Sequence, residues 1–170
     1  MRKLMRSVAR VQMEREGVRI DTEALKAYGR ELEHELLDLT RRILDYAGPD
    51  FNPDSPRQLG ELLFGKLGLP AGKKTASGQY ATDEKTLVKL IDVHPVIGLI
   101  LEYRACTKLK STYVDKLPTL IDEQGRVHTT YAQAFTETGR LSSSDPNLQN
   151  IPVRTERGKY IRAAIVARDA

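Results

Sequence analysis

The chain has almost no sulfur chemistry and no membrane-length apolar run. Cys106 is the single cysteine of the 170 residues, so an intramolecular disulfide is excluded. Mean hydropathy is -0.43, and no apolar stretch reaches the length that crosses a bilayer. The basic start of the chain is not followed by the apolar core of a signal peptide. We therefore expect a soluble, cytoplasmic protein that binds no membrane.

The motifs of common catalytic sites are also missing. There is no Gly-rich phosphate loop, no HExxH and no GxSxG. The histidines, His34, His94 and His128, are scattered, and none has the spacing of metal ligands. Asp145 and Asp169 do not form an evident carboxylate pair. The residues alone thus predict no catalytic centre, metal site or cofactor in this chain.

Basic residues are in moderate excess and unevenly distributed. The net charge of +4 and the sequence pI of about 9.2 do not by themselves identify a nucleic-acid-binding protein. Residues 57–116 hold ten basic and six acidic side chains, and residues 126–170 hold seven and four, whereas residues 1–50 are balanced. A polyanionic partner is therefore expected at the middle and C-terminal parts of the chain.

Hydrophobic residues make up 40% of the chain, enough for a core, and most follow the spacing of helices. Helices are expected over residues 2–16, 22–46, 56–67, 82–90 and 95–116. Ser55, with Gln58 three residues later, predicts a capping box before the third helix, and Thr82 is expected to cap the fourth.

The pattern changes to period two after residue 126. Residues 126–135 and 160–167 each predict a strand, with a long polar loop between them. Two strands are too few for an independent sheet. We therefore predict a mainly α (α+β) fold, with a helical subdomain of long antiparallel helices over residues 1–120 and a two-strand sheet fragment over residues 121–170.

The polar loop has the side chains of a surface that faces a nucleic-acid groove. It reads TGRLSSSDPNLQNIPVR over residues 138–154, with Leu148 and Ile151 placed to anchor it. Its donors are one arginine and three amides: Arg140, Asn147, Gln149 and Asn150. Such donors match the purine N3 and pyrimidine O2 acceptors that every base pair presents in the minor groove. Composition alone equally allows a solvated loop whose amides cap backbone groups.

Four other segments accompany this loop, in chain order: VQMEREGVRID (11–21), FNPDSPRQLGELLFGKLGLP (51–70), YRACTKLKSTY (103–113) and GKYIRAAIVA (158–167). Together with the loop they resemble the family A DNA polymerases, the bacterial DNA polymerase I group, over essentially the whole chain. The resemblance implies a thumb followed by the first part of a palm. It implies roles in DNA replication and repair.

The resemblance implies that the chain grips primer–template double-stranded DNA. Arg140 matches an arginine at the minor groove of the primer end, and the three amides match side chains that line this groove. Arg154 matches a basic residue near the template and nucleotide site. Lys108 and Lys110 match thumb lysines that face the DNA backbone, and the loop with Lys73, Lys74 and Thr82 matches the thumb tip. Ser111, beside the first two lysines, adds a hydroxyl donor for phosphate oxygens.

The resemblance also implies that the catalytic centre lies outside this chain. Family members transfer nucleotides with metal ions, Mg²⁺ in the parent polymerase, held by palm aspartates. The DYSxxELR-like motif that carries the first aspartate is not in these residues, and Asp169 does not match it. We therefore expect this chain alone to hold no cofactor and to bind DNA without polymerase activity.

The remaining palm and the fingers are the further partners that the resemblance implies. Without the palm, the two predicted strands would expose their edges, and exposed edges tend to pair with another chain. We expect either disorder near the C-terminus or a symmetric or swapped homodimer. Two alternatives stay open: a self-standing nucleic-acid-binding protein, and a helical interaction module whose basic residues are only solvated.

Overall fold

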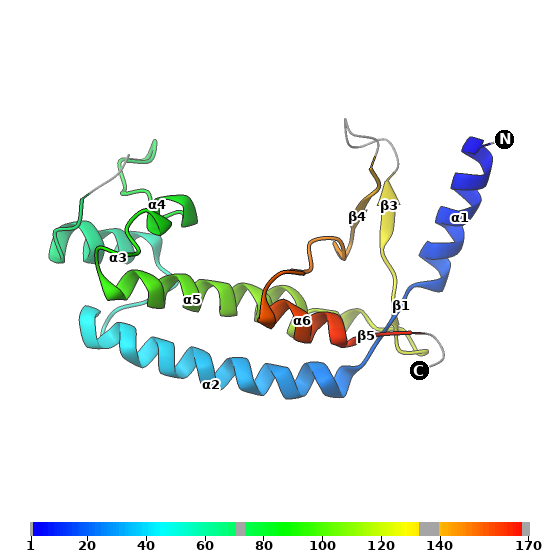
Figure 1. Ribbon diagram of the computed structural model, residues 1–170, viewed down its shortest axis with the longest axis horizontal. Helices are drawn as coiled ribbons and strands as arrows, with labels where there is room; N and C mark the ends of the chain where they lie inside the picture. The colour runs from blue at the N-terminus through cyan, green and yellow to red at the C-terminus, as the bar shows by residue number, and fades with distance from the viewer. Residues whose placement is uncertain (1, 71–73, 133–139, 168–170) are drawn as a thin grey trace. The chain divides into compact units, whose positions relative to one another are not determined.

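The computed structural model describes residues 2–70, 74–132 and 140–167 of the chain, with side chains described from Val8 onwards. The fold is mainly helical with small antiparallel sheets, which confirms the predicted class (Figure 1). No helix in these ranges is long and apolar enough to cross a membrane.

The chain divides into two compact units. One combines Met1–Glu31 with Leu109–Ala170, and the other is Leu32–Lys108. The division into a helical subdomain over residues 1–120 and a sheet fragment over residues 121–170 stays a prediction.

Helices α1 (Arg2–Glu16) and α2 (Thr22–Ala47) lie where apolar spacing predicts them. Gly17 ends α1 at a φ of 63°. A Cβ atom at Gly17 would lie 2.7 Å from the Val127 carbonyl oxygen, so glycine is required for this close approach as well as for the backbone angle. The first helix therefore ends at Gly17, and an extended segment, Val18–Ile20, separates it from the second.

The third predicted helix forms as α3 (Pro56–Gly60), which continues as one π-helical stretch, η1 (Glu61–Lys66). Ser55 caps α3, because its Oγ accepts from the Gln58 N–H at 3.3 Å. The reciprocal half of the predicted capping box is absent from this cap, since Gln58 Oε1 accepts from the Asn52 N–H at 2.6 Å instead. The predicted apolar face is buried at Leu59, Leu62 and Leu63, together with Phe64.

The prediction that Thr82 caps the fourth helix is wrong. Asp83 caps α4 (Glu84–Val88), because its carboxylate accepts from the Thr86 N–H at 3.0 Å and the Thr86 hydroxyl at 2.8 Å. Thr82 is buried instead, and its carbonyl accepts from the Arg104 guanidinium. A charged carboxylate one residue later thus takes the free N–H groups of the helix start.

The last long helix is less regular than its apolar pattern predicts. α5 (Pro95–Leu109) is followed by a π-helical stretch, η2 (Lys110–Val114), and a short 3₁₀ turn, η3 (Leu117–Leu120). Cys106 is buried in α5. The π-helical hydrogen bonds that begin at Lys110 bring its side chain next to that of Asp115, five residues later.

A three-stranded antiparallel sheet links the two ends of the chain. β1 (Val18–Ile20) lies between β2 (Arg126–Val127) and β5 (Ile165–Val166). A second pair, β3 (Thr130–Ala132) and β4 (Ser142–Ser144), is also antiparallel. The first predicted strand is therefore split in two, and its residues 133–135 lie outside the described ranges.

The second predicted strand is wrong over most of its length. Residues Glu156–Ala163 form helix α6, and only Ile165–Val166 are extended. Thr155 starts the helix by accepting the Gly158 N–H at 3.1 Å. Gly158, Ile161 and Ala164 are buried at three-residue spacing, which a helix produces and an alternating strand does not.

Candidate nucleic-acid interface

The predicted groove-facing segment is described from Arg140 to Arg154 and lies in the unit that contains α1. It leaves β4 through the cis Asp145–Pro146 bond, with Asp145 at a φ of 54°. Asn147 Oδ1 then accepts from the N–H groups of Gln149 at 3.0 Å and Asn150 at 3.2 Å, which folds this part into a tight turn. Thr138 and Gly139 lie outside the described residues.

The turn separates polar from apolar side chains as the sequence predicts. Asn147, Gln149 and Asn150 are exposed, whereas Leu148 is half-buried and Ile151 is buried. The side-chain amides of Gln149 and Asn150 make no hydrogen bond with any described residue. Their donors and acceptors therefore face solvent.

An exposed arginine lies at each end of this segment. Arg140 lies two residues before β4, and Arg154 lies immediately before Thr155, the residue that caps α6. Helix capping thus fixes the backbone beside Arg154, and strand pairing fixes the backbone just after Arg140. The structure brings the five predicted residues of the segment into one unit.

The three serines of the segment do not act alike. Ser143 is 3% exposed, and its hydroxyl bonds within the protein, whereas Ser144 is exposed. Strand alternation explains the difference, because the middle residue of β4 faces away from the side that Ser144 exposes.

The strand pair that carries the segment is fastened to α1. Glu14 Oε1 accepts from the Tyr131 N–H at 2.8 Å, and Arg10 Nη1 donates to the Tyr131 carbonyl at 3.4 Å. Nearer the helix end, the Arg126 guanidinium donates to the Glu16 carbonyl. The first helix and the third strand therefore hold each other although they are far apart in sequence.

The lysines predicted to face the DNA backbone are in different states. Lys108 is exposed at the end of α5, and Ser111 is exposed on η2. Lys110 is mostly buried, and its Nζ contacts both carboxylate oxygens of Asp115 at 2.8 and 3.0 Å. Part of the charge that a phosphate would need at Lys110 is therefore already balanced.

The predicted thumb-tip loop lies in the other unit. Lys74 is exposed and forms an isolated β-bridge with Tyr80, whose ring centroid lies 5.3 Å from its Nζ. Thr75 and Ser77 share a hydroxyl hydrogen bond of 2.9 Å. Lys73 lies outside the described residues, and Thr82 is buried. Lys74 is thus the described lysine of this loop that is presented to solvent.

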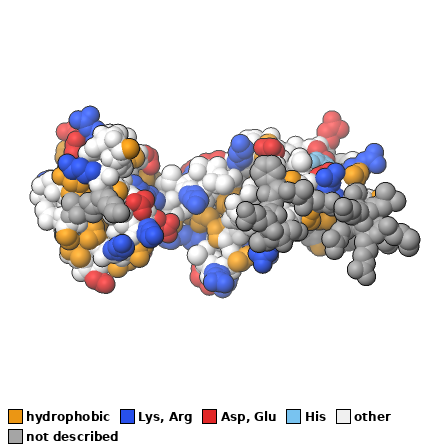
Figure 2. Space-filling view, turned by 90° about the horizontal axis from the view of Figure 1, so that it is seen from above, with side chains coloured by type: hydrophobic (Ala, Val, Ile, Leu, Met, Phe, Trp, Pro, Cys, Tyr) orange, Lys and Arg blue, Asp and Glu red, His pale blue; other side chains and the backbone are white. Residues whose placement is uncertain are grey.

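Charges of both signs are mixed on the face drawn in Figure 2. Lysine and arginine side chains there are interspersed with aspartate and glutamate and do not form one uninterrupted basic patch.

Three partners, two carboxylates and one backbone carbonyl, were missed by sequence reasoning. The Asp115 carboxylate pairs with Lys110 across a five-residue spacing, which a π-helical turn brings together. The Asp122 carboxylate and the Glu14 backbone carbonyl contact the two ring nitrogens of His128, which the sequence left isolated. The glycine turn at Gly125, which reverses the chain between Asp122 and His128, was the signal that could have paired them.

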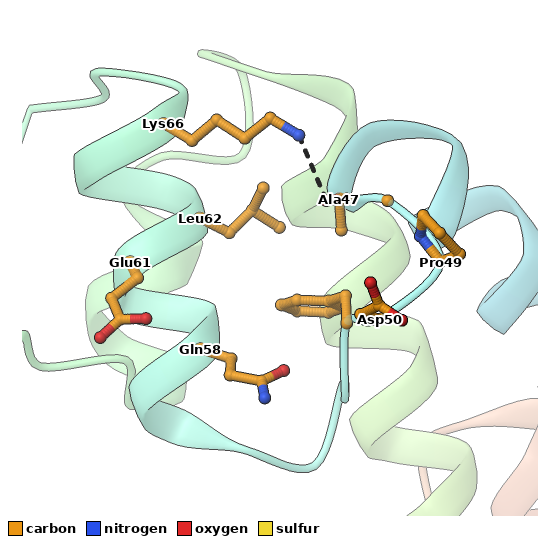
Figure 3. A pocket seen from close by; sticks show the side chains of 9 residues that line it. Ala47, Pro49, Asp50, Gln58, Glu61, Leu62 and Lys66 are labelled. Atoms are coloured by element: carbon orange, nitrogen blue, oxygen red, sulfur yellow. Dashed lines mark hydrogen bonds between the residues drawn. The ribbon is translucent and has the colours of Figure 1, made fainter.

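A cavity of about 390 Å³ lies in the Leu32–Lys108 unit, and none of the predicted site residues lines it (Figure 3). It is formed by the end of α2 and by α3 with η1. Lys66 Nζ borders it and donates to the Tyr46 and Ala47 carbonyls at 3.3 and 3.2 Å, which caps the C-terminus of α2.

The family model for DNA polymerase family A matches residues 22–170. The chain therefore belongs to DNA polymerase family A. It is 51% identical over 155 residues to DNA polymerase I of Lactococcus lactis subsp. cremoris, which covers 91% of this chain and 18% of the relative. It is 49% identical over 158 residues to DNA polymerase I of Pseudomonas aeruginosa, covering 92% of this chain and 17% of the relative.

The fold resembles a solved polymerase domain. The POL domain of Pol1 from M. smegmatis, in a complex with DNA primer-template and dNTP, matches with a TM-score of 0.82 and 41% identity, over 91% of this chain and 27% of that chain. The chain thus spans less than a fifth of the curated relatives named above.

The described residues do not form a metal site of the kind that the family uses for nucleotide transfer. Among the described residues, no group of three or more His, Cys, Asp or Glu side chains is placed to hold a metal ion. We assign no Mg²⁺ site to them and derive no catalytic step through a metal.

Proposed function

We propose that this chain is the duplex-gripping part of a bacterial DNA polymerase I and that it binds primer–template DNA by minor-groove and phosphate contacts. The observation that carries the proposal is the exposed row of amides between Arg140 and Arg154. It is supported by membership of the family and by the likeness to a domain solved with DNA primer-template.

The chemistry of the amides suits a minor groove. Gln149 and Asn150 each carry two N–H donors that no described residue uses. Every base pair offers N3 or O2 acceptors in the minor groove, so these donors bind duplex without selecting a sequence. A polymerase that copies any template requires this kind of contact. Arg140 and Arg154 add charge-assisted donors at the two ends of the row.

Lysines and hydroxyls supply the phosphate contacts. Lys74, Lys108 and Ser111 are exposed and bind phosphate oxygens directly. Lys110 joins them by exchanging its Asp115 partner for a phosphate. We place this activity in DNA replication and repair in the bacterial cytoplasm.

The chain alone is proposed to bind DNA without extending it. The palm and fingers of the parent polymerase supply the aspartates and Mg²⁺ that nucleotide transfer requires. Primer extension by the pure chain with Mg²⁺ and all four dNTPs would overturn this part of the proposal.

The binding part is tested by fluorescence anisotropy with a primer–template duplex at several salt concentrations. We expect affinity to fall steeply with salt, because phosphate contacts release counterions. Arg140→Ala should weaken binding at a primer terminus more than binding to blunt duplex. Arg41→Ala, an exposed arginine on α2 that pairs with Asp38, is the matched control. Salt-independent binding, or equal effects of the two variants, would favour the helical interaction module.

A further inference from the structure

Two buried hydroxyl groups lie beneath the turn that presents the amides. Thr129 and Ser143 are 6% and 3% exposed, and their oxygens lie 2.8 Å apart. Thr129 Oγ1 is also 2.9 Å from the Ser144 carbonyl oxygen and 2.7 Å from that of Pro146. A single threonine side chain thus contacts the backbone on both sides of Asp145.

The hydrogen bonds of the two hydroxyls form one network. The Leu148 N–H donates to Ser143 Oγ at 3.1 Å. The Ser144 and Pro146 carbonyl oxygens can only accept, so they share the Thr129 hydroxyl hydrogen. Ser143 Oγ lies 2.8 Å from Thr129 Oγ1 and 3.2 Å from the Pro146 carbonyl oxygen, and its hydrogen serves these two acceptors. The result is one relay that joins the Leu148 N–H, through the two hydroxyls, to the Ser144 and Pro146 carbonyls.

The relay closes the backbone of the turn on itself. It joins the residues before and after Asp145, whose φ of 54° lies in the left-handed region that few residues other than glycine adopt, asparagine and aspartate most often among them. Asn147 follows directly, and its side chain shapes the turn that exposes Gln149 and Asn150. The hydroxyls therefore determine where the amide row begins, without reaching solvent themselves.

We propose that Thr129 and Ser143 are positioning residues that hold the amides of Asn147, Gln149 and Asn150 in register for a minor groove. This inference rests on the proposed function, because it assigns the support of the same site. Donors that are aligned before binding lose less freedom when the duplex arrives. A connected, buried relay provides such alignment better than separate contacts.

The decisive variant is Thr129→Val, which keeps the shape of the side chain and removes the hydroxyl. We expect the affinity for primer–template duplex to fall about three- to tenfold, the range that corresponds to one net hydrogen bond. We also expect faster hydrogen exchange at the Leu148 amide, measured by NMR. The Leu148 N–H bonds to Ser143 and not to Thr129. Faster exchange of this amide in Thr129→Val would therefore show that the loss of the Thr129 hydroxyl weakens the whole relay.

Matched variants separate the hydroxyl from simple packing. Thr129→Ser keeps the hydroxyl and should restore both affinity and the slow exchange of Leu148. Thr130→Val makes the same chemical change at the next, exposed residue and should alter neither. Ser143→Ala removes the middle of the relay and should reproduce Thr129→Val. Circular dichroism of each variant confirms that the chain is folded.

The outcomes distinguish this inference from the proposed function. If Arg140→Ala and Gln149→Ala weaken duplex binding while Thr129→Val and Ser143→Ala leave it unchanged, the positioning role is wrong and the DNA grip stands. If Thr129→Ser fails to restore binding, packing rather than the hydroxyl is responsible and the inference is also overturned. If none of the four variants changes duplex affinity, the proposed function itself fails.

Discussion

His128 Nε2 lies 2.9 Å from Asp122 Oδ2, while the other ring nitrogen lies 2.8 Å from the Glu14 carbonyl oxygen. Both partners are acceptors, so both bonds form only when the imidazole carries two hydrogens and a positive charge. The cation lies beside the C-terminal carbonyls of α1, where the helix dipole favours it. His128 therefore fastens α1 to the segment between β2 and β3 in its protonated form.

The first prediction is a pH dependence of stability. The hydrogen bond to Asp122, then that to Glu14, raises the pKa of His128 above 6.5, although burial and, less strongly, the charge of Arg126 oppose this. The hydrogen bond from His128 lowers the pKa of Asp122 below 3.8. The His128 contribution is full below pH 6.5 and is lost as pH rises through its raised pKa. That of Asp122 is full above pH 3.8 and is lost as pH falls through its lowered pKa.

The stabilisation by the pair is therefore greatest between about pH 4 and 6.5. Thermal unfolding of the wild type and His128→Gln should differ more at pH 5.5 than at pH 9. His34→Gln, an exposed histidine of α2, is the control and should show no such pH-dependent difference. An equal loss at both pH values would mean that the His128 bonds do not depend on protonation.

The second prediction concerns Gly17. Alanine there would carry a left-handed φ of 63° and place Cβ 2.9 Å from His128 Nδ1. Gly68 has a φ of 62° with nothing within 4 Å, so Gly68→Ala isolates the backbone cost of about 1–2 kcal/mol. Gly17→Ala should cost clearly more in urea unfolding, because it adds the steric clash. Equal losses would show that the α1 end moves aside freely.

The third prediction contrasts two helical glycines. A Cβ at Gly158 would lie 2.7 Å from Pro152 Cβ and would also clash with the Pro152 carbonyl oxygen. Because that oxygen belongs to the backbone, only a movement of the backbone would relieve the clash. Gly98 in α5 has nothing within 4 Å. Gly98→Ala should therefore stabilise the chain by up to about 1 kcal/mol, and Gly158→Ala should destabilise it. Chemical unfolding measures both, and a stabilising Gly158→Ala would contradict the packing of α6 on the segment.

The fourth prediction tests Lys110 as a phosphate contact. Asp115→Asn removes the carboxylate that lies 2.8 Å from its Nζ, so duplex affinity at low salt should rise. Lys110→Ala should lower the affinity and reduce the slope of its salt dependence by about one. Glu23→Gln makes the same charge change beside Lys26 on α2 and should have little effect. Equal gains from both acidic variants would indicate net charge only.

Periodic features of this protein are readable in the sequence. Residues 2–16 and 22–46 form helices because apolar side chains recur at three-four spacing and Gly17 interrupts them. The family was recognisable because several motifs occur in one order, and the outward amides over a buried Ile151 followed from their alternation. The strand predicted over residues 160–167 was wrong, because a short apolar run fits the period of a helix as well as that of a strand. The hydrogen bond from the Gly158 N–H to the Thr155 hydroxyl starts a helix there instead.

By itself, the sequence determined the helical class, the family and the polar character of residues 140–154, because spacing and composition are local properties of a chain. Tertiary structure decided which groups distant in the chain meet: His128 with Glu14, and Thr129 with Ser143 and Pro146. It also buried the Ser143 hydroxyl within the protein. Strand pairing creates these neighbours, and local spacing does not encode them.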